Sequence, residues 1–437
     1  MTEVLAHTSG CESLDFACDL GSFCNTAKSI DNGKLGRHWA TQSCFTAFAA
    51  SEWVTISDKA LFLRMVALEK SLVVYHPLFR WQSSHPFRLF HCQSILTQDA
   101  AMNLSLSIRL IVVLGLFSSV FITGRVGFAA EPGFAIKRDG DKIAVLIGEK
   151  PFAEYVANDP ATNKSYLWPV FGPGGVAMTR DFPMKNIEGE VKDHYHHRGL
   201  WFGHEDIGGY DSWTERGSFD KGEKTSDANK ERIAKLGKQV HRKFREVSAT
   251  QDKATIVSEI DYVTPQGKTS VSEIQTLVFR VEGKLRLIDF NQDFIAGEGD
   301  VTFGDKKDAG LCIRVPTSMS VDSKLGGRIF NSEGLTDAAA WGQRAKWCDY
   351  SGPVANATHG VAILNHPSSF RYPTTWHVRT YGLFTANPFG TLDPKSPNGP
   401  HTLRSGETLK LRHRFVFHEG DATAAKIEEA YANYIKN

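Results

Sequence analysis

The chain has 437 residues, of which 50 are Lys or Arg and 49 are Asp or Glu, so its formal net charge is +1. This balance gives no electrostatic case for binding nucleic acid or an anionic membrane surface. The 28 Phe and 9 Trp residues argue against a disordered chain. The length is sufficient for one large or two ordinary domains with a sizeable core.

Residues 1–101 differ in composition from the rest of the chain. They contain five of the seven cysteines, and no helical or strand period runs through them. The cysteine spacing matches no common zinc-binding pattern. We therefore interpret residues 1–101 as a non-native or disordered N-terminal extension.

Residues 102–130 have the pattern of a secretory signal peptide. Arg109 precedes an uninterrupted apolar run, and small residues follow that run. A positive start, a short apolar stretch and a small-residue exit are typical of such peptides, and the run is shorter than the roughly 20 residues of a membrane span. We predict that translation starts at Met102 and that the mature protein, residues 131–437, is periplasmic or secreted. The alternative is a cytoplasmic extension followed by a membrane anchor at residues 104–122.

Short strands separated by turn residues dominate the mature chain. Two strand-like runs flank Asp139-Gly140-Asp141, which is a hairpin signal. Later runs alternate apolar and polar residues, as from Ile256 to Val263. We predict strands at residues 134–138, 142–147, 152–156, 166–171, 176–180, 240–247, 254–263, 271–281, 285–295, 311–315, 328–330, 361–364, 376–385 and 409–417.

These closely spaced period-two segments indicate an all-β fold, a large antiparallel β-sandwich. Residues 217–229 are polar and charged and are expected to form an exposed loop. The one predicted helix is C-terminal, with Asp421 as its N-cap and an apolar stripe from Ile427 to Ile435. We expect residues 131–437 to form a single β-sandwich domain with this helix packed on it.

Cys312 and Cys348 are the two cysteines of the mature chain. An oxidising compartment would permit a disulfide between them, and the alternative is a pair of buried free thiols. The mature chain contains no apolar run long enough for a stable membrane span. We expect a small-molecule or glycan ligand and no nucleic acid.

Residues 193–206 concentrate more titratable side chains than any other part of the chain. Histidine has an ordinary pKa near neutrality, which suits it to both proton transfer and metal ligation. The stretch therefore predicts a functional site. Its charged and titratable members are Asp193, His194, His196, His197, Arg198, His204, Glu205 and Asp206, interleaved with Trp201 and Phe202.

A second part of the site is expected at residues 375–379, which read as a strand. Alternation along a strand places His377 and Arg379 on one face, with Trp376 and Val378 on the other. We expect this strand to form the wall opposite residues 193–206.

Several motifs occur together in one known family. They are residues 166–175 (YLWPVFGPGG), 179–181 (TRD), 193–206, 365–367 (NHP), 376–384 (WHVRTYGLF), 387–390 (NPFG), 412–414 (RHR) and 418–421 (HEGD). The sequence resembles an uncharacterised, often exported bacterial family whose members are commonly labelled "methane oxygenase PmoA" (PmoA-like), and the resemblance covers essentially all of the mature chain. It implies a sandwich (supersandwich) similar to galactose mutarotase-like folds. Tyr195 stands where the family pattern has proline.

The first functional interpretation is acid–base chemistry on a sugar or sugar acid. Histidines transfer protons near neutral pH, with a neighbouring carboxylate orienting the imidazole, and arginines stabilise a carboxylate or an enolate-like oxyanion. Aromatic rings stack on a pyranose. The candidate catalytic residues are His194, His197, Arg198, His377 and Arg379, and the candidate substrate-binding residues are Trp201, Tyr210, Trp213, His204 and Asp206. An enzyme of this kind would be a lyase, hydrolase or epimerase.

Two other interpretations use the same region. The first, which the family label suggests, is an oxygenase or hydrolase that depends on a divalent transition metal (Cu, Fe or Zn), with His194, His196 and His204 as candidate ligands. The second is a non-catalytic glycan-binding module that uses Trp201, Tyr210 and Trp213. Any single residue of the set can instead be a core residue with satisfied hydrogen bonds.

Overall fold

The computed structural model describes residues 133–436. These residues belong to one compact unit, residues 119–437. The predictions for residues 1–101 and for a signal peptide at residues 102–130 fall outside the described residues and stay predictions. Within residues 133–436, no helix has the length and apolar character needed to cross a membrane.

The fold is a β-sandwich whose first layer is an eight-stranded sheet with only antiparallel neighbours. Strands that are distant in sequence lie next to each other in its second half, where β5 pairs with β11 and β11 with β16. In spatial order the strands are β1 (Phe134–Asp139), β2 (Lys142–Ile147), β3 (Lys150–Val156), β4 (Tyr166–Val170), β5 (Leu200–His204), β11 (Ala309–Arg314), β16 (Leu383–Asn387) and β15 (Thr375–Val378).

The second layer is another eight-stranded antiparallel sheet. Its strands, in spatial order, are β12 (Arg328–Asn331), β13 (Trp347–Val354), β14 (Ala357–Asn365), β18 (Thr408–Glu419), β9 (Leu285–Ala296), β8 (Thr269–Glu282), β7 (Lys253–Val263) and β6 (Lys238–Ala249). A separate pair joins β10 (Val301–Phe303) to β17 (His401–Leu403). The all-β prediction is therefore confirmed.

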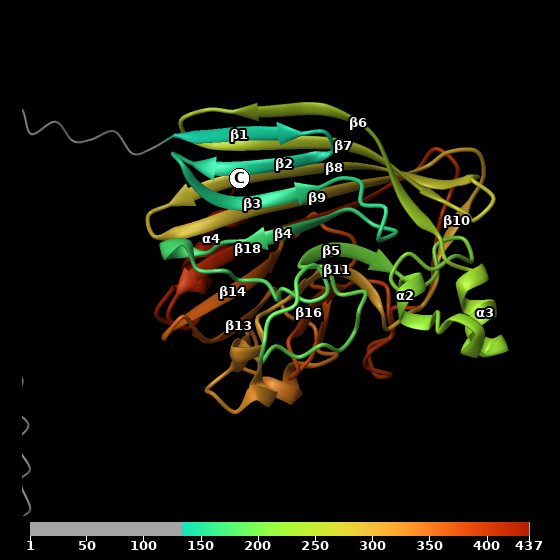
Figure 1. Ribbon diagram of the computed structural model, residues 1–437. Helices are drawn as coiled ribbons and strands as arrows, with labels where there is room; N and C mark the ends of the chain where they lie inside the picture. The colour runs from blue at the N-terminus through green and yellow to red at the C-terminus, as the bar shows by residue number, and fades with distance from the viewer. Residues whose placement is uncertain (1–132, 437) are drawn as a thin grey trace, which may run out of the picture. The chain divides into compact units, whose positions relative to one another are not determined.

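The two large sheets pack face to face around one apolar core (Figure 1). Rings of the two layers meet there: Phe152 of β3 contacts Phe279 of β8 edge to face at 5.5 Å between ring centroids, and Phe202 of β5 contacts Phe294 of β9 at 5.0 Å. Alternation explains why the strands form, since Ile256 and its period-two neighbours along β7 are buried. Apolar burial between the layers is the dominant stabilising contribution.

Few helices accompany the sheets. Figure 1 shows α2 (Arg216–Phe219) and α3 (Asp227–Ala234) close to the end of β5. The C-terminal α4 (Ile427–Tyr434) packs on the second sheet, where Trp347 donates a hydrogen bond to Glu428 at 2.7 Å. The remaining helical turns are η1 (Pro173–Gly175), η2 (Gly222–Lys224), η3 (Thr317–Met319), η4 (Val321–Ser323) and η5 (Asp337–Ala340).

Four local predictions are corrected. Residues 176–180 form no strand, because the chain leaves the sheet at η1 and keeps one isolated bridge there, between Phe171 and Ala177. Residues 217–229 are not a plain loop, since Ser226 caps the start of α3 by accepting from the Asn229 backbone N–H. The predicted strand at residues 376–385 is two strands, β15 and β16.

The fourth correction concerns the start of the C-terminal helix. Asp421 caps the turn that precedes α4, where its carboxylate accepts from the backbone N–H groups of Thr423 and Ala424 at 3.1 and 2.9 Å. The N-cap position of α4 itself is Lys426. The helix and its buried stripe are otherwise as predicted, except that Ile435 is exposed.

Cys312 of β11 and Cys348 of β13 are both buried and free. They belong to different sheets, so the disulfide alternative does not occur in this structure. Burial raises the pKa of both thiols well above the usual value, which makes them unreactive apolar side chains.

Candidate functional site

A cleft of about 580 Å³ lies on the outer face of the first sheet, where β5, β11, β15 and β16 end. Strand alternation places its residues there: Phe202 and Trp376 point into the core, while the residues next to them in sequence point outward. The cleft brings the two predicted walls together. Its lining includes His194, His196, His197, Trp213, His377 and Arg379, together with Lys192, Glu205, Ser218, Lys221, Arg232, Lys307, Asp308 and Tyr381.

The histidine segment forms a turn. His194 has a positive φ of 42°, and the backbone N–H of His197 donates to the carbonyl of His194 at 3.0 Å. In an extended chain His197 would face away from His194 and His196. The turn instead brings all three rings to the same cleft.

The ring of His194 is stacked between two other rings. Its centroid lies 4.7 Å from that of His197 and 4.9 Å from that of Tyr381, with interplanar angles of 9° and 5°. His197 is buried and accepts a hydrogen bond on Nδ1 from Arg314 at 3.0 Å. Burial, then the neighbouring His196 and Arg314, lowers the pKa of His197 well below its usual value. His197 therefore stays neutral, and the partly exposed His194 presents the accessible ring.

Asp193 fixes this turn to the body of the protein. Its carboxylate pairs with the buried guanidiniums of Arg180 and Arg314 and with Nδ1 of His194, at 2.8 Å for Arg314 and 2.9 Å for His194. Burial alone would raise the pKa of Asp193, but the hydrogen bond from His194 and the charge of Arg314 outweigh it and hold the pKa well below its usual range. Asp193 is thus an anionic anchor at neutral pH.

Arg198 lies beneath the cleft and does not line it. It forms an ion pair with Glu215 through Nε (3.1 and 3.2 Å) and Nη2 (2.7 Å), and Glu215 also pairs with Lys164 at 3.4 Å. All three side chains are at most 4% exposed. Lys164 in turn donates to the backbone carbonyls of His196 and Trp213. The structure places Arg198 in a buried charge network that supports the floor of the cleft.

His377 occupies the opposite wall of the cleft and contacts the carboxylate of Asp308. Its Nδ1 accepts from the indole N–H of Trp341 at 2.9 Å, and its Nε2 lies 3.2 Å from Asp308. An indole N–H only donates, so Nδ1 carries no proton and the proton of the neutral ring is on Nε2, directed at Asp308. Burial, which lowers the pKa of His377, also favours this neutral form.

Asp308 lies directly opposite Glu205 across the end of the β5–β11 ladder. The last named pair of that ladder is His204 with Ala309, and the Glu205 backbone N–H donates to the Asp308 carbonyl at 3.0 Å. Opposed residues of an antiparallel pair share a face, with Cβ atoms roughly 5 Å apart. The two carboxylates therefore meet in the cleft.

The pKa values of the two carboxylates are shifted in opposite directions. Burial, with the nearby Asp308 and Asp211, raises the pKa of Glu205 to about 7. Burial would also raise the pKa of Asp308, but the His377 hydrogen bond and the charge of Lys307 outweigh it and lower the pKa. At neutral pH Asp308 is ionised, and Glu205 is protonated in a large fraction of molecules.

The remaining predicted site residues lie elsewhere. His204 points into the core against Phe389, with Nδ1 accepting from the Asp206 backbone N–H at 2.9 Å. Trp201 is fully buried beneath His197. Asp206 and Tyr210 line two other hollows, outside the cleft.

The metal alternative has no preformed ligand set in the part of the chain that the structure describes, where no three His, Cys, Asp or Glu side chains converge on a point that could hold an ion. The side chain of His204 is directed into the core, away from the rings of His194 and His196, which share the cleft.

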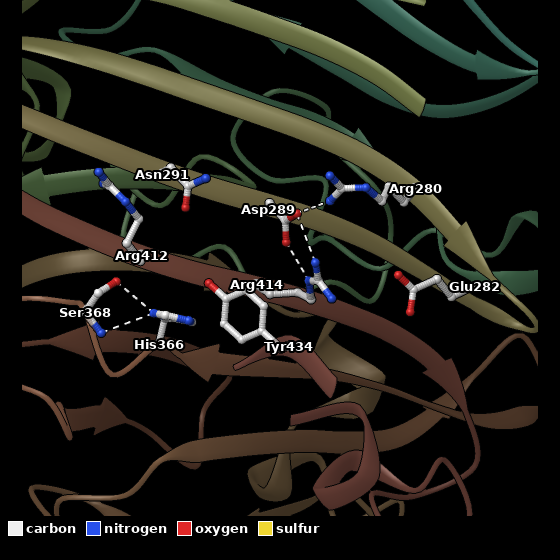
Figure 2. Close-up of a pocket in the computed structure, with 9 residues that line it drawn as sticks. All are labelled: Arg280, Glu282, Asp289, Asn291, His366, Ser368, Arg412, Arg414 and Tyr434. Atoms are coloured by element: carbon white, nitrogen blue, oxygen red, sulfur yellow. Dashed lines mark hydrogen bonds and ion pairs between the residues drawn. The ribbon is translucent and has the colours of Figure 1, made fainter. Parts of the chain in front are cut away.

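A second cleft, of about 560 Å³, lies on the outer face of the second sheet near α4. Figure 2 shows the guanidiniums of Arg280 and Arg414 directed at Asp289. Arg412, also in this cleft, pairs with Asp293. Each arginine of the second cleft thus has a carboxylate partner.

Sequence reasoning missed Asp308 and Trp341 and named Glu205 only as one of the titratable residues of the stretch 193–206. The sequence predicts a strand only from residue 311, whereas the observed β11 begins at Ala309 and so places Asp308 directly at the strand end. Its pairing with Glu205 depends on β5 lying beside β11, and these strands are about 100 residues apart in the chain. No local pattern carries that information.

A model of a family of unknown function (DUF6807) matches residues 142–432. No curated protein matches the chain. Neither the family description nor the similar solved structures support the methane oxygenase label.

Three of the solved structures that are similar to this chain share 10% identity with it. They are the galactosidase domain of an α-galactosidase-sucrose kinase (TM-score 0.30, 65% of this chain and 42% of that chain), galactose 1-epimerase from Lactobacillus acidophilus NCFM (0.28, 66% and 98%) and a putative aldose 1-epimerase from Escherichia coli K12 (0.25, 66% and 99%). The chain thus spans about two fifths of the galactosidase-domain chain. At these TM-scores the likenesses carry no argument about function.

Proposed function

Because the chain belongs to this family of unknown function, its role has to be inferred from its own site, and we propose an enzyme that performs general acid–base catalysis on a sugar or sugar acid. Glu205 is the general acid and Asp308 the general base. His377, held by Trp341, is a positioning residue that keeps Asp308 oriented and ionised.

The observation that carries this proposal is that the pKa values of two facing carboxylates are shifted in opposite directions. An acid and a base of the same chemical type can work together only if their surroundings separate their pKa values. Glu205, with a pKa of about 7, retains a proton to donate near neutral pH. Asp308, with its lowered pKa, stays available to accept one. General acid–base groups of this kind contribute about 10²–10⁴-fold to rate.

The lining of the cleft supports a saccharide as the ligand. Most of its side chains are charged or polar. A polyhydroxylated ring matches such a lining, because its hydroxyls pair with polar groups. The volume lies within the usual range for small-ligand sites, roughly 300–1,000 Å³. The reaction classes that need only an acid and a base here are hydrolysis, elimination and epimerisation.

The glycan-binding alternative gains no support from the positions of its three rings. Trp201 and Trp213 are 0% and 1% exposed, and Tyr210 lies at another hollow. They therefore offer no common exposed platform.

The test is a saccharide panel followed by pH profiles. Turnover of neutral and acidic oligosaccharides is followed by NMR, and kcat/KM is then measured against pH for the best substrate. We expect activity to fall above about pH 7 as Glu205 loses its proton, and to fall at acid pH as Asp308 gains one.

Glu205→Gln removes the transferable proton with little change in shape, and about a 10²–10⁴-fold loss is expected. Glu282→Gln, a carboxylate of the second cleft, is the matched control and keeps wild-type activity. The proposal is wrong if no saccharide is turned over, or if Glu205→Gln retains more than about a tenth of the activity.

A further inference from the structure

The cleft around Glu205 and Asp308 carries an excess of positive charge. Five cationic side chains line it against these two carboxylates, in a chain whose formal net charge is only +1. The cations are Lys192, Lys221, Arg232, Lys307 and Arg379. A cleft lined by one sign of charge attracts ligands of the other sign.

Two of these cations are already engaged with the acid–base pair. Lys307 lies 3.4 Å from Asp308, and Arg232 lies 3.7 Å from Glu205. The other three form no ion pair among residues 133–436. Within the part of the chain that the structure describes, these three cations of the cleft therefore have no carboxylate partner.

Arg379 is the best-positioned of the three unpaired cations. Its guanidinium lies over the rings of Trp341 and Tyr381, at 5.8 and 5.7 Å from their centroids. Its backbone is fixed in the turn between β15 and β16, where its N–H donates to Leu383 at 2.7 Å and its carbonyl accepts from Tyr350 at 3.2 Å. Aromatic faces hold a guanidinium in place and leave its N–H edge free to donate.

The arginines of the second cleft differ from Arg379 because each of them has a carboxylate partner within the protein. There Arg280 and Arg414 converge on Asp289, as Figure 2 shows, and Arg412 pairs with Asp293. Arg379 has aromatic neighbours in place of such a carboxylate. The difference indicates that its partner comes from outside the chain.

We propose that the ligand of the first cleft is an anionic saccharide whose carboxylate or sulfate group binds Arg379. The saccharide part rests on the proposed function, whereas the anionic part rests on Arg379 and the unpaired lysines. A planar guanidinium pairs with either group through two parallel N–H···O bonds. Arg379 is on the same strand end as His377, so the anionic group is held next to the Glu205–Asp308 pair.

The test compares matched ligands by isothermal titration calorimetry. The probes are oligogalacturonate, a sulfated galactan oligosaccharide and a neutral galactan oligosaccharide of equal length, titrated into the full chain as purified. We expect one of the two anionic probes to bind at least tenfold more tightly than the neutral probe. That affinity should also fall as NaCl is raised, because salt screens exposed charges.

Arg379→Gln should weaken binding of the anionic probe by about 10- to 100-fold, the size of a lost charge-assisted pair, and leave the neutral probe unchanged. Arg280→Gln, in the second cleft, is the control and binds as wild type. Arg379→Lys keeps the charge without the planar fork and should retain an intermediate affinity, which serves if the glutamine variant does not fold.

The outcomes separate the two proposals. Tight binding of galacturonate that needs Arg379 assigns a carboxylate, and the same result with the sulfated probe assigns a sulfate. Equal affinity for neutral and anionic probes, or an anionic affinity that Arg379→Gln does not change, overturns the anionic ligand. If neutral saccharides are nevertheless turned over in a Glu205-dependent way, the proposed function stands. If no saccharide binds, both fail.

Discussion

Replacing Glu215 with glutamine should destabilise the protein strongly, although Glu215 does not line the cleft. Its carboxylate is the shared partner of Arg198 and Lys164, whose side chains are 4% and 0% exposed, and it also accepts from Thr162 at 2.7 Å. The substitution keeps the shape and removes the one carboxylate that forms ion pairs with these two cations within residues 133–436. Two buried cations would then lose their direct ion-pair partner.

Removing one partner of a buried pair typically costs about 3–5 kcal/mol. We expect the free energy of unfolding of Glu215→Gln to fall by an amount in this range. Urea denaturation followed by tryptophan fluorescence measures it, and an unchanged slope against urea shows that two-state unfolding is kept. Glu282→Gln removes an exposed carboxylate and should change stability by less than about 0.5 kcal/mol.

The refuting result is a Glu215→Gln protein within about 1 kcal/mol of wild type, since that value is ordinary for a neutral hydrogen bond. Arg198 would then not need its charge partner. An Arg198→Met variant that lost activity at unchanged stability would return Arg198 to the catalytic residues, where its sequence position had suggested it.

Three further predictions concern other parts of the chain. Burial lowers the pKa of His418, but Asp349, at 2.7 Å, outweighs burial and raises the pKa overall. The stability that this pair adds is complete below the unfolded pKa of about 6.5 and is lost as pH rises through the raised folded pKa. The free energy of unfolding measured with urea should therefore differ less between pH 6 and pH 9 in His418→Asn than in wild type. Trp341→Phe removes the donor to His377 and should lower kcat by about tenfold with KM little changed, whereas an unchanged kcat would mean that the tautomer is fixed without it. Mass spectrometry of the protein isolated from its native source should find no peptide from residues 1–101, and any such peptide would refute a start at Met102.

The sheet strands were largely predictable because their physical signal is local. Along β7 the alternation of Ile256 with its neighbours indicates which face is buried. Asp139-Gly140 marks a hairpin turn, and that turn requires the positive φ that Gly140 adopts. A half-buried strand can be recognised from consecutive residues alone, because apolar and polar side chains alternate along it. The same signal placed His377 and Arg379 on one face, and both side chains line the cleft.

The chemistry of the site was less predictable because it depends on pairings between distant segments. His204 and Glu205 are neighbours in sequence, yet one points to the core and the other to the cleft, and the direction is set by the register of β5 against β11. The turn at His194 depends on a positive φ, which is unusual for any residue except glycine. Neither feature follows from the cluster of histidines that first marks this region.

Glu205 and Asp308 lie on one hydrogen-bonded ladder. The spacing of these two carboxylates and the choice of ligand can therefore change independently during evolution. Their spacing is set by the β5–β11 register, whereas the groups that would select a ligand come from peripheral pieces, the segment around α2 and α3 with Lys221 and Arg232 and the β15–β16 turn with Arg379. Under the proposed function, exchanging those pieces between family members would change which saccharide is accepted and leave the proposed acid–base pair in register. Related chains with one reaction and divergent ligands are the expected evolutionary outcome.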